Sequence, residues 1–164
     1  MNSEVEIVPA ASQDEIAEAR RLFEEYGRSL SFSLCFQGFS EELASLPGAY
    51  APPAGRLLLA RVPEGFAGCV ALRPIDAATG EVKRLYVAPE FRKKRIGRMM
   101  AERVIEEARK IGYAKLRLDT LTAMTEARSL YRSLGFYETA PYHASPLSGT
   151  VYMELVLAPA PERV

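Results

Sequence analysis

The chain has 164 residues, which is enough for one domain with a substantial hydrophobic core. Its 21 basic and 21 acidic residues cancel, which excludes the overall electrostatic attraction used by proteins that bind nucleic acids or acidic membranes. Two cysteines without metal-ligand spacing, no leader peptide and no apolar run of membrane-spanning length predict a cytoplasmic protein without a metal.

Apolar periodicity and turn residues divide the chain into strands and helices. The expected order is a strand at 5–8, helices at 13–27 and 41–46, strands at 56–62, 66–72 and 81–87, a helix at 97–111, a strand at 115–120, a helix at 124–134, and strands starting at 136 and 150. Gly27 is expected to end the first helix. Residues 29–39 fit a strand or an extended loop equally well. This order predicts one α+β domain over residues 1–157, with helices against a mixed sheet, and a frayed tail at 158–164.

The stretch from Leu85 to Met100 combines a strand end, a cationic loop and a helix start. The four basic residues Arg92–Arg95 stand shortly before Gly97, where the helix is expected to begin. The free N–H groups of a first helical turn favour an anion, and so does the helix dipole. A solvated helix start is the alternative, but the position directly after a strand favours phosphate contact. We therefore expect this turn to hold the pyrophosphate of a coenzyme.

Three segments carry a family resemblance: KRLYVAPEFRKKRIGRMM at 83–100, LDT at 118–120 and ARSLYRSLGF at 127–136. They resemble the GNAT superfamily of acyl-CoA-dependent N-acyltransferases, and the resemblance covers residues 57–157. The resemblance implies the GNAT fold, with a mostly antiparallel sheet of about six to seven strands. The family turn reads Arg/Gln-x-x-Gly-x-Gly/Ala, and here Arg95 stands in place of the first glycine. We expect position 95 to be helix-like, so that its N–H still donates while its side chain points away.

The resemblance also implies acetyl-CoA as the cosubstrate. The strand before the turn would splay from its neighbour, so that its backbone N–H groups bind the acyl carbonyl and the pantetheine arm. The implied coenzyme-binding residues are Leu85, Tyr86, Val87, Arg92, Lys93, Lys94, Arg95, Ile96, Gly97, Arg98 and Tyr131. Met124 stands where many members have a coenzyme-binding asparagine, so that contact is lost or comes from Thr122 or Thr125.

Two residues match catalytic positions of the family. Tyr131 would give a proton to the departing coenzyme A thiolate, although its spacing also suits a core aromatic residue. Glu81 would act as a base, directly or through water, although a glutamate at a strand edge is as often surface charge. Phe36, Tyr142 and His143 are expected to bind the acceptor. His143 is also an eligible base because histidine titrates near neutral pH, but a lone loop histidine is more often merely exposed.

The sequence therefore predicts an N-acetyltransferase that moves an acetyl group from acetyl-CoA to a primary amine of a small molecule or peptide by direct attack. The alternative is a non-catalytic acyl-CoA-binding regulatory domain with the same fold. A nucleic-acid-binding protein that uses the basic turn is a further alternative, which the neutral net charge disfavours. The last strand, at 150–157, is apolar enough to pair at a sheet edge, which makes a homodimer possible.

Overall fold

A seven-stranded mixed sheet organises the structure, a computed structural model that describes residues 4–30, 33–34 and 38–157. The sheet order is β1-β2-β3-β4-β5-β7-β6, and every neighbouring pair is antiparallel except the parallel pair β4–β5. The strands are β1 (Glu6–Pro9), β2 (Arg56–Val62), β3 (Gly65–Pro74), β4 (Thr79–Val87), β5 (Lys115–Leu121), β6 (Tyr137–Thr139) and β7 (Thr150–Val156). The helices are α1 (Gln13–Ser29), α2 (Phe39–Ser45), α3 (Ile96–Ile111) and α4 (Thr125–Ser133), with 3-10 turns η2 (Gly48–Tyr50) and η3 (Pro89–Phe91). The expected α+β fold and mostly antiparallel sheet are confirmed.

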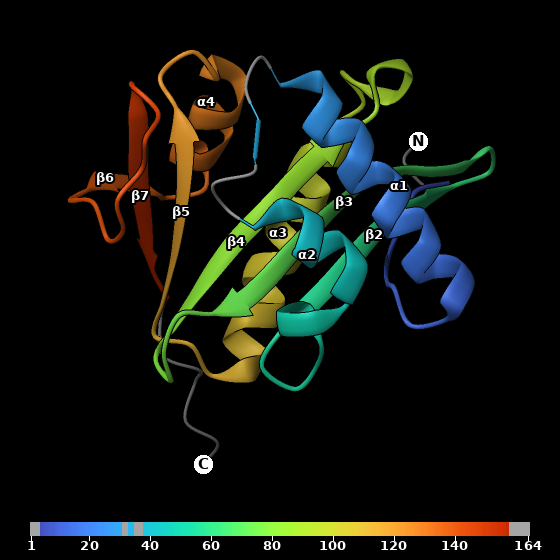
Figure 1. Ribbon diagram of the computed structural model, residues 1–164, viewed down its shortest axis with the longest axis horizontal. Coiled ribbons are helices and arrows are strands. Elements are labelled where there is room, and N and C mark those ends of the chain that lie inside the picture. Colours follow the sequence, from blue (N-terminus) through green and yellow to red (C-terminus); the bar gives the residue numbers. More distant parts are fainter. Residues whose placement is uncertain (1–3, 31–32, 35–37, 158–164) are drawn as a thin grey trace.

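Helices cover both faces of the sheet, with α1 and α2 on one face and α3 on the other (Figure 1). Alternation along β2 supplies both faces with apolar side chains. Leu59 belongs to the same buried cluster as Phe23 of α1, whereas Leu58 belongs to the cluster of Met100 and Val104 of α3. Each face of the sheet therefore has its own apolar core.

Helix α1 begins as predicted but ends later. Ser12 Oγ accepts a hydrogen bond from the Glu15 N–H at 3.1 Å, and Glu15 Oε1 accepts one from the Ser12 N–H at 2.9 Å, which is the expected capping box. The expected end at Gly27 is wrong, because the helix runs to Ser29. A Cβ at Gly27 would lie 2.9 Å from the ring of Phe39, so the glycine gives α2 room to pack against α1.

The last strand is not a sheet edge. β7 pairs with β5 along its whole length, and β6 pairs with its other side at Tyr152–Glu154. The expectation that this strand pairs at an edge is therefore wrong for these residues, and a homodimer stays a prediction. In the described ranges, no helix is both long and apolar enough to cross a membrane. The cytoplasmic location and the domain limits stay predictions, and the tail at 158–164 lies outside the described residues.

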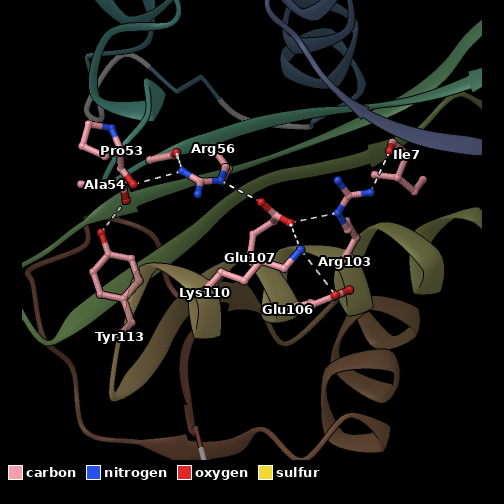
Figure 2. Close-up of polar contacts among 10 residues, drawn as sticks. Ile7, Pro53, Ala54, Arg56, Arg103, Glu106, Glu107, Lys110 and Tyr113 are labelled. Carbon is pink, nitrogen blue, oxygen red and sulfur yellow. Dashed lines mark hydrogen bonds and ion pairs between the residues drawn. The ribbon is translucent and has the colours of Figure 1, made fainter. Parts of the chain in front are cut away.

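A polar network fixes the C-terminal half of α3 against β1 and β2 (Figure 2). Glu107 Oε1 accepts a hydrogen bond from Arg56 Nε at 2.9 Å, and its Oε2 accepts from Arg103 Nε at 3.1 Å and Lys110 Nζ at 3.3 Å. Arg103 also donates to the carbonyl oxygen of Ile7 in β1, at 2.9 Å. Burial opposes the charge of Glu107, but the three donors outweigh it and lower the pKa of this carboxyl to about 2.

Candidate functional site

The sheet opens where β4 and β5 separate. Only Thr79–Glu81 of β4 pair with β5, at Lys115–Arg117, and the strands diverge beyond that point (Figure 1). The splay that the family resemblance implied is therefore present. Because β5 continues its pairing with β7, the opening lies inside the sheet rather than at its edge.

A β-bulge interrupts β4 at this opening. Arg84 has a positive φ of 60°, and the register with β3 shifts between Cys69 and Ala71. The Arg84 guanidinium donates two hydrogen bonds to Glu42 of α2, at 2.8 and 2.9 Å, and lies 5.1 Å from the ring centroid of Phe39. Because both charged side chains are largely buried, loss of either one would leave the other unpaired in apolar surroundings. This ion pair therefore holds the bulge in place.

A groove of about 990 Å³ runs from the end of β4 to the start of α3, and we call it the coenzyme groove. Most of the predicted coenzyme-binding residues line it, namely Leu85, Tyr86, Val87, Arg92, Lys93, Arg95, Ile96 and Gly97. Among the described residues, no side chain caps the N-terminus of α3, so its first N–H groups can bind a ligand in the groove. A cationic loop beside an uncapped helix start fits the pyrophosphate of a coenzyme.

The other predicted coenzyme-binding residues lie outside the lining of this groove. Lys94 Nζ lies 5.9 Å from the ring centroid of Phe91. Arg98 donates a hydrogen bond to Ser133 Oγ at 2.7 Å, which ties α3 to α4. Tyr131 lines an adjoining cavity instead.

The two threonines considered as substitutes for the family asparagine have different positions. Thr125 lines the coenzyme groove together with Met124. Thr122 Oγ1 instead donates a hydrogen bond to the carbonyl oxygen of Gly149 at 3.0 Å. Thr125 is therefore the better placed of the two to contact a coenzyme.

Arg95 has a left-handed backbone conformation. It is the N-cap residue of α3, with φ 64° and ψ 17°, and Lys93 also has a positive φ of 65°. The expectation of a helix-like position 95 is therefore wrong. A residue with a Cβ costs about 1–2 kcal/mol in this region, which glycine avoids. The turn thus keeps an αL residue where the family has glycine, at a cost in backbone strain.

A cavity of about 100 Å³, which we call the central cavity, occupies the opening between β4 and β5. Side chains from both faces of the sheet line it: Lys83 and Asp119 lie on the α1–α2 face, and Thr120 and Tyr131 lie on the α3–α4 face. Burial raises the pKa of the Tyr131 phenol, so this group stays protonated and can donate a proton. The central cavity adjoins the coenzyme groove through the shared residues Tyr26, Leu85, Met124 and Ala127.

A further cavity of about 440 Å³, the acceptor cavity, opens on the α1–α2 face. Its lining residues are Ala49, Arg73, Pro74, Ile75, Glu81, Lys83, Tyr142, His143 and Ala144. Glu81 lies opposite Arg73 in the β3–β4 ladder and accepts hydrogen bonds from Arg73 Nε at 2.8 Å and from the Tyr142 hydroxyl at 2.6 Å. Burial opposes the charge of Glu81, but Lys83, Tyr142 and Arg73 outweigh burial and hold its pKa below the usual value. Glu81 is therefore an ionised carboxylate at neutral pH.

His143 has contacts at both ring nitrogens. Its Nε2 lies 2.6 Å from Asp119 Oδ2, and its Nδ1 lies 2.9 Å from the carbonyl oxygen of Ala144. Carboxylate and carbonyl oxygens only accept hydrogen bonds, so both contacts form together only when both nitrogens carry a proton. In this arrangement neither nitrogen offers a lone pair to a substrate proton.

Glu81, Asp119 and His143 also place potential metal-ligand atoms within 4.8 Å of one another. However, the Glu81 oxygens accept from Arg73 and Tyr142, and Asp119 contacts His143. These hydrogen bonds account for the close approach of the three side chains, and the absence of a metal stays a prediction.

The predicted acceptor and catalytic residues fall into two groups. Tyr142 and His143 do lie together with Glu81, in the acceptor cavity. Tyr131 lies in the central cavity, so the two predicted catalytic residues line different but adjoining spaces. Phe36 lies outside the described residues.

Sequence reasoning missed Arg73, Lys83 and Asp119. Lys83 could have been found, because it follows Glu81 by two residues and so shares its face of the strand. Arg73 and Asp119 become visible only when the strand register is known, and a single sequence does not supply that register.

Comparisons with known proteins agree with this geometry. The model of the acetyltransferase (GNAT) family matches residues 16–136. An uncharacterized N-acetyltransferase of Schizosaccharomyces pombe is 36% identical over 158 residues, which cover 95% of this chain and 97% of the relative. A solved acetyltransferase of Streptococcus agalactiae has a TM-score of 0.77 at 20% identity, covering 94% of this chain and 99% of that one. A GNAT family acetyltransferase of Elizabethkingia anophelis, solved with acetyl-CoA bound, has a TM-score of 0.69 at 22% identity, covering 94% and 99%. The chain therefore belongs to the acetyltransferase (GNAT) family and is an acyltransferase.

Proposed function

We propose that this acyltransferase moves the acetyl group of acetyl-CoA to a primary amine of a small molecule or peptide by direct attack. The observation that carries the proposal is the continuity of three spaces through the open sheet. The coenzyme groove adjoins the central cavity, and Lys83 lines both the central and the acceptor cavity. A thioester from one side and an amine from the other can therefore meet beside Tyr131.

Aminolysis of a thioester forms a C–N bond and breaks the C–S bond, while the amine loses a proton and the sulfur gains one. In the proposed reaction, backbone N–H groups near Leu85–Val87, on the part of β4 that has separated from β5, stabilise the oxyanion. Tyr131 supplies the proton to the departing sulfur, because burial keeps its phenol protonated. No covalent enzyme intermediate is required, since both reactants are held at the same time.

Glu81 is the proposed acceptor of the amine proton, directly or through water. Its carboxylate is ionised, and it lies in the cavity through which the amine arrives. His143 fits the role of a base less well, because both its ring nitrogens already face acceptors. Tyr142 and His143 form the wall of the proposed acceptor site.

The proposed pyrophosphate site consists of Arg92, Lys93, Arg95 and the first turn of α3. These three side chains line the coenzyme groove, and the uncapped N–H groups of the helix lie beside them. Lys94 belongs to the same loop but does not line the groove, which makes it a matched control.

Thermal unfolding with and without acetyl-CoA tests the coenzyme site. A ligand that binds only the folded state adds about 2.7 kcal/mol of stability at a hundredfold excess over its dissociation constant. We expect the double variant Lys93→Gln, Arg95→Gln to lose much of this shift and Lys94→Gln to keep it. Absence of any shift in the native protein would refute the proposed coenzyme site.

Thiol release from acetyl-CoA with a panel of amines tests the transfer itself. We expect release of coenzyme A that depends on the amine and produces the acetylated amine. A clear thermal shift without turnover on any amine would favour the non-catalytic acyl-CoA-binding domain instead.

A further inference from the structure

The acceptor cavity contains ionisable side chains of both signs. Arg73 and Lys83 contribute two cations, Glu81 contributes one carboxylate, and His143 is paired with Asp119. A polyamine would bring several ammonium groups against Arg73 and Lys83, and like charges at short range are unfavourable. The basic side chains in the lining, Arg73 above all, therefore favour an acceptor that carries an anionic group.

Arg73 can bind such an anion. Its Nε donates to Glu81, and in the described part of the chain its terminal nitrogens make no hydrogen bond. The side chain is 38% exposed and lines the acceptor cavity. It also borders a space of about 220 Å³ that Glu41 and Glu42 line, where Glu42 is paired with Arg84. A planar guanidinium with free N–H groups is the side chain best suited to carboxylate recognition.

The spacing of the two opposite charges defines the ligand further. The Arg73 guanidinium and the Glu81 carboxylate are in contact, at 2.8 Å. An α-amino acid presents its amino group and its carboxylate on one carbon atom, so its two charges are also adjacent. An amino acid that lies beside this pair can set each of its charges against the opposite charge of the protein. Its carboxylate then meets Arg73 and its amino group meets Glu81. The apolar residues Pro74 and Ile75 line the same cavity and give an amino-acid side chain a surface to pack against.

We propose that the acceptor is an α-amino acid with a free carboxylate, which Arg73 binds while Glu81 faces the amino group. This inference rests on the proposed acetyl transfer and adds its substrate class. Arg73 thereby determines specificity by binding the carboxylate of the acceptor, in addition to its hydrogen bond to Glu81.

Acetyl transfer to matched compounds tests the inference. Each set contains an amino acid, the amine that lacks its carboxylate, and the amino-acid amide, for example L-phenylalanine, phenethylamine and L-phenylalaninamide. A charge-assisted hydrogen bond to a carboxylate corresponds to about tenfold or more in kcat/KM. We expect the native enzyme to prefer the free amino acid by at least about that factor.

Variants of Arg73 locate the effect. Arg73→Met should raise the KM for the amino acid by about tenfold or more relative to any change in the KM for the matched amine, which also reports the loss of the Arg73–Glu81 contact, whereas Arg73→Lys should retain part of the preference. Arg61→Met is the matched control, since Arg61 also pairs across strands with a glutamate, Glu6, at 2.8 Å but lies away from the cavity. It should change neither KM.

The outcomes separate the two proposals. Equal or better use of the amines and amides would overturn the amino-acid inference while acetyl transfer stands, and so would an Arg73→Met variant with an unchanged preference. Binding of acetyl-CoA without transfer to any member of the sets or of the wider amine panel would overturn the proposed function and this inference with it.

Discussion

Replacement of Glu107 by glutamine should destabilise the fold in a way that depends on pH. The surroundings of Glu107 lower the pKa of its carboxyl from 4.5 to about 2. One pKa unit corresponds to about 1.36 kcal/mol, so this pKa change would add about 3.4 kcal/mol to the free energy of unfolding if solvent screened none of it. Arg103 and Lys110 are partly exposed and screened by solvent, so we expect Glu107→Gln to lower the free energy of unfolding by about 1.5–2.5 kcal/mol at pH 7.

The pH dependence follows from the direction of the pKa change. Because the folded-state pKa lies below the unfolded one, the stabilisation is complete above pH 4.5 and is lost as the pH falls toward 2. Urea unfolding at pH 7 and at pH 3 measures both values, and at pH 7 the midpoint should fall by about 1 M. Glu106→Gln is the control, because Glu106 is the neighbouring residue on α3 and its pair with Lys110 is exposed. A loss at Glu107 no larger than at Glu106, or equal at both pH values, would refute the reasoning.

Three further substitutions test the site and the backbone. Tyr131→Phe should lower kcat for thiol release by about a hundredfold or more and keep the thermal shift with acetyl-CoA; an unchanged kcat would assign Tyr131 to the core alone. Arg95→Gly should raise the free energy of unfolding by about 0.5–1 kcal/mol, because the relief of left-handed backbone strain exceeds the gain in conformational entropy of the unfolded chain. A lower midpoint on thermal unfolding would contradict this. Gly27→Ala should fail to give the gain of about 1 kcal/mol that helix propensity predicts, because the added Cβ meets the ring of Phe39; a full gain in the urea midpoint would show that the ring moves freely.

The parts of the fold that the sequence predicted are those governed by local chemistry. The capping box at Ser12 and Glu15, the apolar stripe of α3 and the bounds of β2 all follow from residues within a few positions of one another. The turn before α3 could be located for the same reason, because its strand, its basic loop and Gly97 are consecutive. Most residues predicted to bind the coenzyme therefore line one groove.

The parts that the sequence did not predict depend on pairing between distant segments. Arg73 meets Glu81 because of the β3–β4 register, and Asp119 meets His143 because the loop between β6 and β7 returns over β5. The conformation of Arg95 was missed for a different reason. An arginine in a left-handed position opposes the local preference, and only the surrounding turn enforces it.

Arg84 also has a conformation and an environment that are locally unfavourable, and both contribute to the shape of the site. A positive φ and a buried charge are each unfavourable for an arginine in a strand, yet this residue has both. Its pair with Glu42 and its place over the Phe39 ring compensate the charge, and both contacts connect β4 to α2. The bulge that results lies in the part of β4 that no longer pairs with β5. Because the sheet is open there, Tyr131 on one face and Lys83 on the other line a single cavity, which the proposed transfer between the two faces requires.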